Sequence, residues 1–137
     1  MRPQPLLCVD DVEATSAWYQ RLLGARSDHG GPDYERLIDR DGRLVMQLHA
    51  WDVAHHHGPI ADPAVRPYGN GVLLWFEVDD FDAAVARAHE LGAEVVIGAH
   101  RNPPDGSGGP NHREIWLRDP NGYAIVLASL FGDAAPQ

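Results

Sequence analysis

The chain has 137 residues, 44% of them hydrophobic, which is enough for one folded domain with a core. Its 20 acidic and 11 basic residues give a net charge of −9 with histidine neutral, which disfavours binding to the phosphate backbone of nucleic acids. No apolar run is long enough to span a membrane and the single cysteine, Cys8, excludes an internal disulfide, so we expect a cytoplasmic protein with no nucleic-acid or membrane partner.

Eight strands and two helices are predicted in chain order. The first set comprises strands near 4–9, 25–28, 34–38 and 43–49, with a helix that begins after Asp11 and ends at Gly24. The second set comprises strands near 71–78, 94–97, 113–118 and 123–128, with a helix that begins after Asp80 and ends at Gly92. Aspartate is a favoured N-cap and glycine a favoured C-terminal residue of helices, so both helices are well defined.

The two sets are copies of one pattern. Val9-Asp10-Asp11-Val12 recurs as Val78-Asp79-Asp80-Phe81, and each copy follows an apolar run and precedes a helical pattern. Later in each set, Asp41-Gly42 and Asn121-Gly122 predict hairpin turns in which glycine takes a positive φ. The offset is roughly 70 to 80 residues, so the chain is predicted to hold two β-α-β-β-β modules.

Two long connections accompany these modules. Residues 50–70 are rich in histidine and proline and include His55-His56-His57, whereas residues 98–112 are rich in glycine and proline. Ordered connections of this length are often lids or binding loops. The alternative is a disordered surface excursion, and the sequence favours neither interpretation over the other.

The duplicated pattern resembles the vicinal-oxygen-chelate superfamily, which includes glyoxalase I, extradiol dioxygenases and bleomycin-resistance proteins. The matching motifs are residues 9–24, residues 78–93 and the segment from Arg113 to Gly122, and the resemblance covers Gln4 to about Ser129. It implies an α+β fold in which two tandem βαβββ modules form a curled mixed sheet. The 137 residues then form a single domain, with module one at about 4–49, a linking loop at about 50–70, module two at about 71–129 and a tail at 130–137.

In that fold helices cover the outside of the sheet and the inside forms a cup. Strand side chains alternate between the two faces, so polarity sorts them into core and cup. The residues expected to line the cup and bind a ligand are Gln4, Leu6, Gln47, His49, Trp51, Leu73, Trp75, Glu77, Glu114, Trp116 and Val126. An apolar cup with indoles and a few polar groups suits a flat organic ligand with a cationic or hydrogen-bonding edge. The alternative is that the tryptophans fill the cup as a second core.

The resemblance also implies where a metal would bind. Metal-dependent members use about four positions, which fall here on Gln4, Gln47 or Met46, Leu73 and Val126. Leucine and valine have no lone pair, and such a site needs three or more protein ligands. We therefore expect no metal and no other cofactor.

A displaced site is the alternative for the metal. His49, Glu114 and His56 are the candidate ligands for a divalent ion such as Ni, Zn, Mn or Fe. The interpretation that we favour over a displaced site is that Glu77 and Glu114 form ion pairs with Arg36 or Arg113, or line a polar pocket. Three other histidines are expected on the surface, namely His29, His89 and His100.

The function favoured by these residues is that of a metal-free small-molecule-binding protein of the glyoxalase and bleomycin-resistance type, which binds an aromatic or cationic compound. Two alternatives stay open. One is a metal-dependent lyase, isomerase or dioxygenase of the same superfamily, and the other is a non-catalytic dimeric interaction module. No catalytic residue is assigned. The resemblance to bleomycin-resistance proteins implies a homodimer whose pocket is shared between chains.

Overall fold

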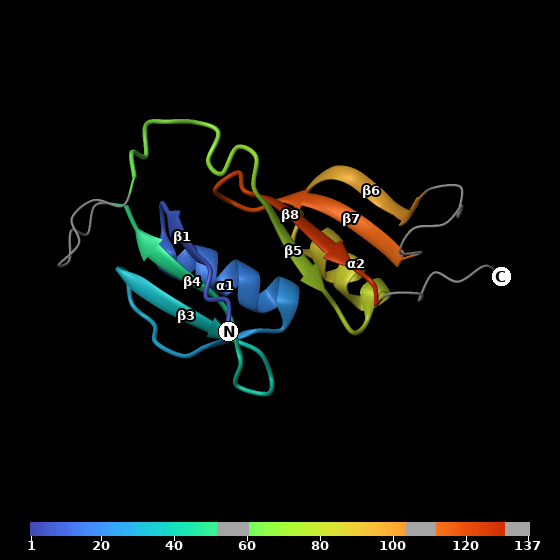
Figure 1. Ribbon diagram of the computed structural model, residues 1–137, viewed down its shortest axis with the longest axis horizontal. Coiled ribbons are helices and arrows are strands. Elements are labelled where there is room, and N and C mark those ends of the chain that lie inside the picture. The colour runs from blue at the N-terminus through green and yellow to red at the C-terminus, as the bar shows by residue number, and fades with distance from the viewer. Residues whose placement is uncertain (52–60, 104–111, 131–137) are drawn as a thin grey trace. The chain divides into compact units, whose positions relative to one another are not determined.

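The computed structural model describes residues 1–51, 61–103 and 112–130 (Figure 1). The chain divides into two compact units, unit 1 from Met1 to Tyr68 and unit 2 from Gly69 to Gln137. Each unit contains one four-stranded mixed sheet and one α-helix, in the order β-α-β-β-β. The predicted α+β fold with two tandem modules is therefore confirmed.

Unit 1 forms its sheet in the spatial order β1-β4-β3-β2. Its elements are β1 (Leu6–Val9), α1 (Val12–Leu23), β2 (Arg26–Ser27), β3 (Tyr34–Ile38) and β4 (Leu44–Ala50). β1 runs parallel to β4, and the other two pairings are antiparallel. α1 packs against β3 and β4.

Unit 2 repeats this topology in the spatial order β5-β8-β7-β6. Its elements are β5 (Leu73–Glu77), α2 (Phe81–Glu90), β6 (Glu94–Asn102), β7 (His112–Arg118) and β8 (Ala124–Ala128). β5 runs parallel to β8, and the remaining pairs are antiparallel. In both units the last strand therefore lies between the first and the third. None of the described helices is long and apolar enough to cross a membrane.

The helices begin and end where the sequence predicts. Asp11 accepts a hydrogen bond from the Ala14 amide at 2.9 Å, and Asp80 accepts one from Ala83 at 3.0 Å. At the C-terminal ends, Gly24 and Gly92 have φ values of 68° and 63°, a conformation that costs other residues free energy.

The two hairpin turns are built in the same way. Asp39 Oδ1 accepts from the amides of Asp41 and Arg43 at 2.9 and 2.8 Å. In unit 2, Asp119 Oδ1 accepts from the amides of Asn121 and Tyr123, both at 2.9 Å. An aspartate that bonds its own downstream amides mimics a backbone turn, so the duplication extends to individual hydrogen bonds.

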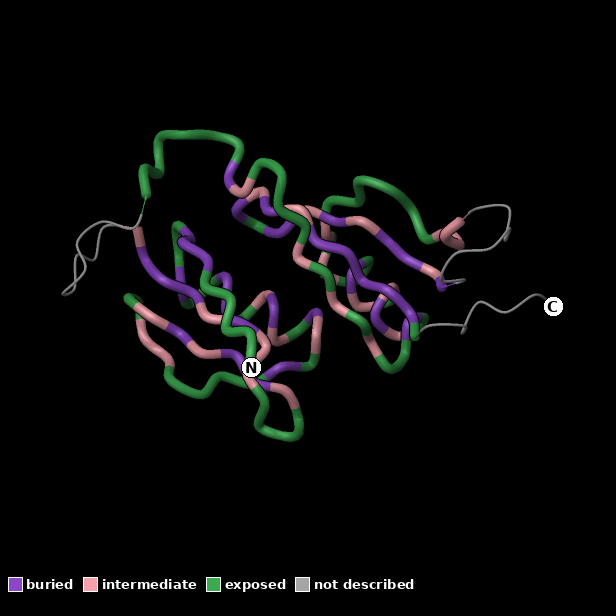
Figure 2. The backbone as a smooth tube through the Cα atoms, in the orientation of Figure 1, coloured by how far each residue is buried: buried purple, intermediate pink, exposed green. Residues whose placement is uncertain are grey.

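The core of each unit lies between its helix and one face of its sheet (Figure 2). The residues with less than 2% exposure include Tyr19, Leu22, Leu37, Met46 and Leu48 in unit 1, and Ile115, Leu117, Ile125 and Leu127 in unit 2. The carboxylate of Glu35 on β3 is also buried there. It accepts a hydrogen bond from the Ser16 hydroxyl of α1 at 2.9 Å.

Two strand boundaries differ from the prediction. β6 continues through Asn102, well into the segment expected to be a long connection, and it has register irregularities between Val95 and His100. β2 is shorter than expected, at two residues. The glycine-rich composition after residue 97 concealed the strand, because Gly98 lies inside it at an irregular pairing, where a glycine is common.

Candidate functional site

The face of the unit 2 sheet that α2 covers is identified by Arg113. Its guanidinium donates to Asp82 of α2 at 2.9 Å and lies 4.7 Å from the centre of the Phe81 ring. Alternation along β7 then places Glu114 and Trp116 on the opposite face, which we call the helix-free face.

Strand register assembles three rows of side chains on the helix-free face of unit 2. The rows run from β5 through β8 to β7: Leu73, Ala124 and Arg118; Trp75, Val126 and Trp116; and Glu77, Ala128 and Glu114. All six of the ligand-binding candidates in this unit thus lie on one face. Ala124, Val126 and Ala128 are small, so the larger side chains of β5 and β7 flank a strip of small ones on β8.

Glu114 is the most extensively bonded side chain on this face. The carboxylate is 3% exposed and accepts four hydrogen bonds. Its Oε1 accepts from Trp116 Nε1 at 3.0 Å and from His100 Nε2 at 3.2 Å. Its Oε2 accepts from His112 Nε2 at 3.0 Å and from Asn102 Nδ2 at 3.2 Å. Burial of such a group without donors is costly, so these four bonds are what keep the carboxylate in place.

The charge of Glu114 follows from these contacts. Burial by itself raises the pKa of the carboxyl, but the hydrogen bonds from Trp116, His112 and Asn102 and the charge of His100 outweigh it, and the pKa is lowered. Glu114 is therefore an ionised acceptor, and a weak base.

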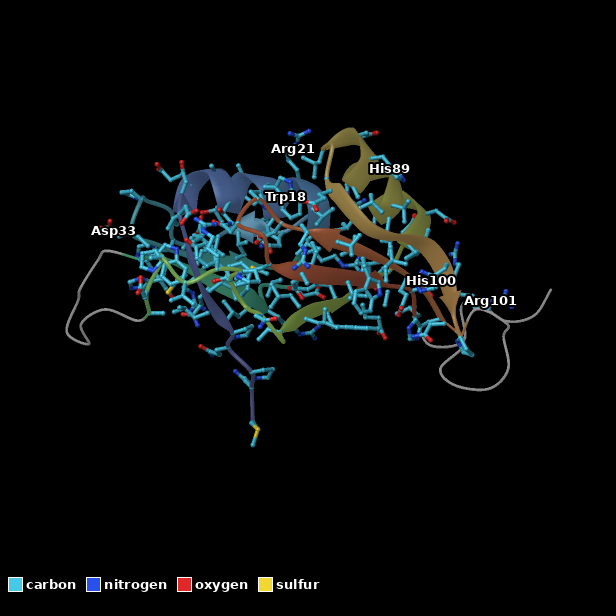
Figure 3. All side chains as sticks on the ribbon, turned by 90° about the horizontal axis from the view of Figure 1, so that it is seen from above. Trp18, Arg21, Asp33, His89, His100 and Arg101 are labelled. Carbon is cyan, nitrogen blue, oxygen red and sulfur yellow. The ribbon has the colours of Figure 1, made fainter. Side chains whose placement is uncertain are left out.

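His100 lies on β6 beside Arg101 (Figure 3). Its Nε2 faces Glu114, and its Nδ1 lies 2.8 Å from the Gly98 carbonyl oxygen. Both partners are hydrogen-bond acceptors. The expectation that His100 is a simple surface residue is wrong, since the side chain is half-buried against the carboxylate.

The Glu114 cluster fixes two aromatic rings. Trp116 is held through its indole N–H, and the His112 ring is held through Nε2. The His112 ring in turn makes an edge contact with Trp75, with ring centroids 5.6 Å apart and planes at 83°. Trp75 is 46% exposed, so the face presents a broad indole in edge contact with a fixed ring.

In unit 1 the face that α1 covers is identified by Glu35, whose carboxylate accepts a hydrogen bond from Ser16 of α1. Alternation and register place Leu6, Gln47 and Arg36 in one row of the helix-free face, and Cys8, His49 and Tyr34 in the next. Tyr34 donates to Gln47 Oε1, and Gln47 Nε2 donates to the Gln4 carbonyl at 3.1 Å.

Three further candidates lie in unit 1. Gln4 itself is exposed. The His49 side chain is 4% exposed, with Nδ1 2.7 Å from the Ala50 carbonyl oxygen and its ring in edge contact with Tyr34. Trp51 is half-buried, its ring 4.8 Å from that of Tyr68, and its buried Nε1 has no hydrogen-bond partner among the described residues.

The residues at the positions implied for a metal do not fit one. Leu73 and Val126 lie on the helix-free face but carry no lone pair, and Met46 lies on the helix side with 1% exposure. Over the described ranges, no group of three or more His, Cys, Asp or Glu side chains is placed to hold a metal ion. Of the displaced candidates, His49 belongs to unit 1, Glu114 to unit 2, and His56 lies outside the described residues.

The arginines have other partners than those suggested for them. Arg36 pairs with Asp28 at 3.3 Å, and Arg113 pairs with Asp82 at 2.9 Å. The donors that hold Glu114 include His100 and Asn102, which sequence reasoning did not assign to the site. The available signal was the spacing of His112, Glu114 and Trp116, which alternate on one strand and share a face.

The comparison with protein families gives the class of protein. Residues 3–127 match the model of the Glyoxalase/Bleomycin resistance protein/Dioxygenase superfamily. The chain therefore belongs to this superfamily, in agreement with its fold and with the resemblance in its motifs. No curated protein matches the sequence.

Solved structures share the fold along nearly the whole chain. An integron cassette protein from the mobile metagenome of V. cholerae has a TM-score of 0.70 and 19% identity, over 94% of each chain. Lactoylglutathione lyase from Agrobacterium tumefaciens has a TM-score of 0.66 and 19% identity, over 94% of this chain and 92% of that one. A glyoxalase/bleomycin resistance protein/dioxygenase family enzyme from Burkholderia phytofirmans PsJN has a TM-score of 0.63 and 18% identity, over 93% and 96%. At these identities the likeness concerns the fold.

Proposed function

We propose that the protein binds a flat aromatic or cationic organic compound on the helix-free face of unit 2, without a metal of its own. The observation that carries this proposal is the exposed indole of Trp75 in a row with Val126 and Trp116, beside a fixed cluster of polar groups. Apolar and aromatic surface with a few placed polar groups is the usual composition of a small-molecule site. Sequestration of a toxic or antibiotic compound in the cytoplasm is the role that fits such binding.

The polar groups of this face support binding more than they support catalysis. A general base needs a pKa near the working pH and a free lone pair directed at the substrate. Glu114 has a lowered pKa, and each of its oxygens already accepts two hydrogen bonds. Its effect is to hold Trp116 and His112 in fixed orientations, which lowers the entropic cost of binding a ring against them.

A thermal-shift experiment tests the proposal. Dialysed protein is heated with a panel of flat aromatic and cationic compounds, and separately with Ni, Zn, Mn and Fe(II). A ligand at about ten times its Kd stabilises the native state by about 1.4 kcal/mol, which raises Tm by a few degrees. We expect a shift with members of the aromatic panel.

Tryptophan variants locate the binding. We expect ligand-induced quenching of fluorescence to be lost or strongly reduced in Trp75→Phe and kept in the matched control Trp18→Phe, because Trp18 lies on α1 (Figure 3). A shift with metals alone that disappears in His49→Ala and Glu114→Ala would instead overturn the proposal of metal-free binding and favour a metal-dependent member of the superfamily. No shift with either panel would favour an interaction module.

A further inference from the structure

The helix-free face of unit 2 carries two carboxylates in one row, and they differ in their surroundings. Glu77 on β5 and Glu114 on β7 flank Ala128 of β8. The oxygens of Glu114 accept four hydrogen bonds from protein donors, so this carboxylate has little capacity left for a ligand. The negative charge of Glu114 therefore interacts with donors of the protein itself.

Glu77 is in the opposite situation. It is exposed, and no hydrogen bond or ion pair joins it to any residue that the structure describes. The basic side chains of the same face have other partners: His100 and His112 contact Glu114, and Arg118 donates to the Gly122 carbonyl at 3.0 Å. The negative charge of Glu77 is thus left unneutralised by its own face.

The neighbour of Glu77 on this face is Trp75. The two residues are two positions apart on β5, so their side chains point to the same side and their Cα atoms are about 6.6 Å apart. Leu73, the next residue along this side of the strand, is 44% exposed. One edge strand therefore presents an aliphatic group, an exposed indole and a free carboxylate in line.

We propose that Glu77 determines the charge specificity of this site, and that the ligand is a planar aromatic compound with a cationic nitrogen on or next to its ring system. The ring stacks on Trp75, and the cationic group contacts the Glu77 carboxylate. An indole face attracts cations and a carboxylate pairs with them, so the two side chains favour the same charge. This inference rests on the proposed function and adds the ligand class and the residue that selects it.

Two probes that share a ring and differ in charge test the inference. An aminoacridine is cationic in mildly alkaline buffer, whereas the parent acridine is neutral there. We expect isothermal titration to show tighter binding of the aminoacridine by wild-type protein, and the preference to weaken as salt is added. In Glu77→Gln we expect the affinity for the aminoacridine to fall about three- to fivefold, while that for acridine stays within about 1.5-fold.

The matched control is Glu90→Gln, which removes an exposed carboxylate from α2 on the other side of the sheet and is expected to leave both affinities unchanged. Circular dichroism confirms that both variants are folded. Equal loss of both probes in Glu77→Gln, or no preference for the cationic probe in wild-type protein, overturns the inference while leaving ligand binding intact. Binding of neither probe, nor of any compound in the thermal-shift panel, would overturn the proposed function itself.

Discussion

At the scale of single residues, the unusual feature is a buried carboxylate that is stabilised almost entirely by neutral and histidine donors. Glu114 is 3% exposed and has no arginine or lysine partner among the described residues. Its four donors come from β6 and β7, so the side chain ties an edge strand to its neighbour. Hydrogen bonds to charged groups are stronger than those between neutral groups, so their loss should measurably lower the free energy of unfolding.

We predict that Glu114→Gln destabilises unit 2 by about 1 to 3 kcal/mol in urea unfolding at neutral pH, because a carboxamide accepts fewer hydrogen bonds and places an NH2 group against other donors. The exposed Glu77→Gln change is the matched control and should alter stability by less than about 0.5 kcal/mol. Equal effects of the two substitutions would contradict the structural role of Glu114.

The same residue also predicts a pH dependence. Because the pKa of Glu114 is lowered from 4.5 in the folded state, its contribution is fully present above that value and is lost as the pH falls through the folded-state pKa. The stability difference between wild-type protein and Glu114→Gln should therefore shrink in acid, starting near that value. Unfolding curves of both proteins recorded from neutral to acidic pH test this prediction. A stability difference that grows on acidification would contradict it.

At the scale of elements, the sequence predicted the strands and turns well but missed local irregularities. Polarity placed Gln47 and His49 together on one face, which the register confirms, whereas counting from the Asp39–Gly42 turn would have placed Met46 there. Counting fails because the register shifts between Leu37 and Ile38, where an extra residue on β4 between Leu44 and Met46 moves the residues that follow it to the opposite face. A bulge leaves no reliable trace in residue composition.

Part of the candidate site could be predicted from the alternation of side chains along each strand. Trp75, Glu114 and Trp116 were found by alternation, which depends only on neighbours in sequence. His100 and Asn102 were not found, because β6 was expected to end at residue 97 and because alternation cannot locate the register shifts between Val95 and His100 that set their pairing with β7. Residues brought together by irregular strands require the structure.

A glycine at the start of unit 2 gives a prediction at this scale. Gly69 has a φ of 65°, and a Cβ added there would lie 2.6 Å from Tyr123 Cδ1. Tyr123 is 7% exposed in the turn before β8, so its ring cannot easily move away. We expect Gly69→Ala to destabilise the protein by about 2 kcal/mol or more, since steric overlap adds to backbone strain.

Gly71→Ala is the matched control for this substitution. Gly71 also has a positive φ, of 88°, but an added Cβ would meet no atom within 4 Å. Gly71→Ala should therefore lower the free energy of unfolding by roughly 1 kcal/mol, which is the cost of the backbone strain alone. Thermal or urea unfolding of the two variants measures the difference, and equal destabilisation would show that the Tyr123 contact is unimportant.

At the scale of the whole molecule, each unit exposes apolar side chains on its edge strands. On β5 and β6 of unit 2 these are Leu73, Trp75, Val95, Val96 and Ile97, each between 39% and 46% exposed. Clusters of exposed apolar residues mark surfaces that bind other molecules. They are compatible with both a ligand and a second chain.

We therefore propose that the protein is a homodimer, and predict a sedimenting mass of about twice the 15.0 kDa of one chain at micromolar concentration. Sedimentation velocity over a dilution series measures it. A single species with the mass of one chain at every concentration would exclude the dimer, and would leave ligand binding to a single chain.

The insertion of each module's last strand between its first and third has a consequence for synthesis on the ribosome. β5 gains a neighbour in its sheet only when β8 is made, because β8 is the strand to which β5 bonds. In unit 1, β1 likewise waits for β4, but β4 ends at Ala50, so this unit is complete while its twin is still being translated. A nascent chain halted shortly before Ala124 would then carry one finished module and, in the other, a hydrophobic edge strand exposed to chaperones and proteases.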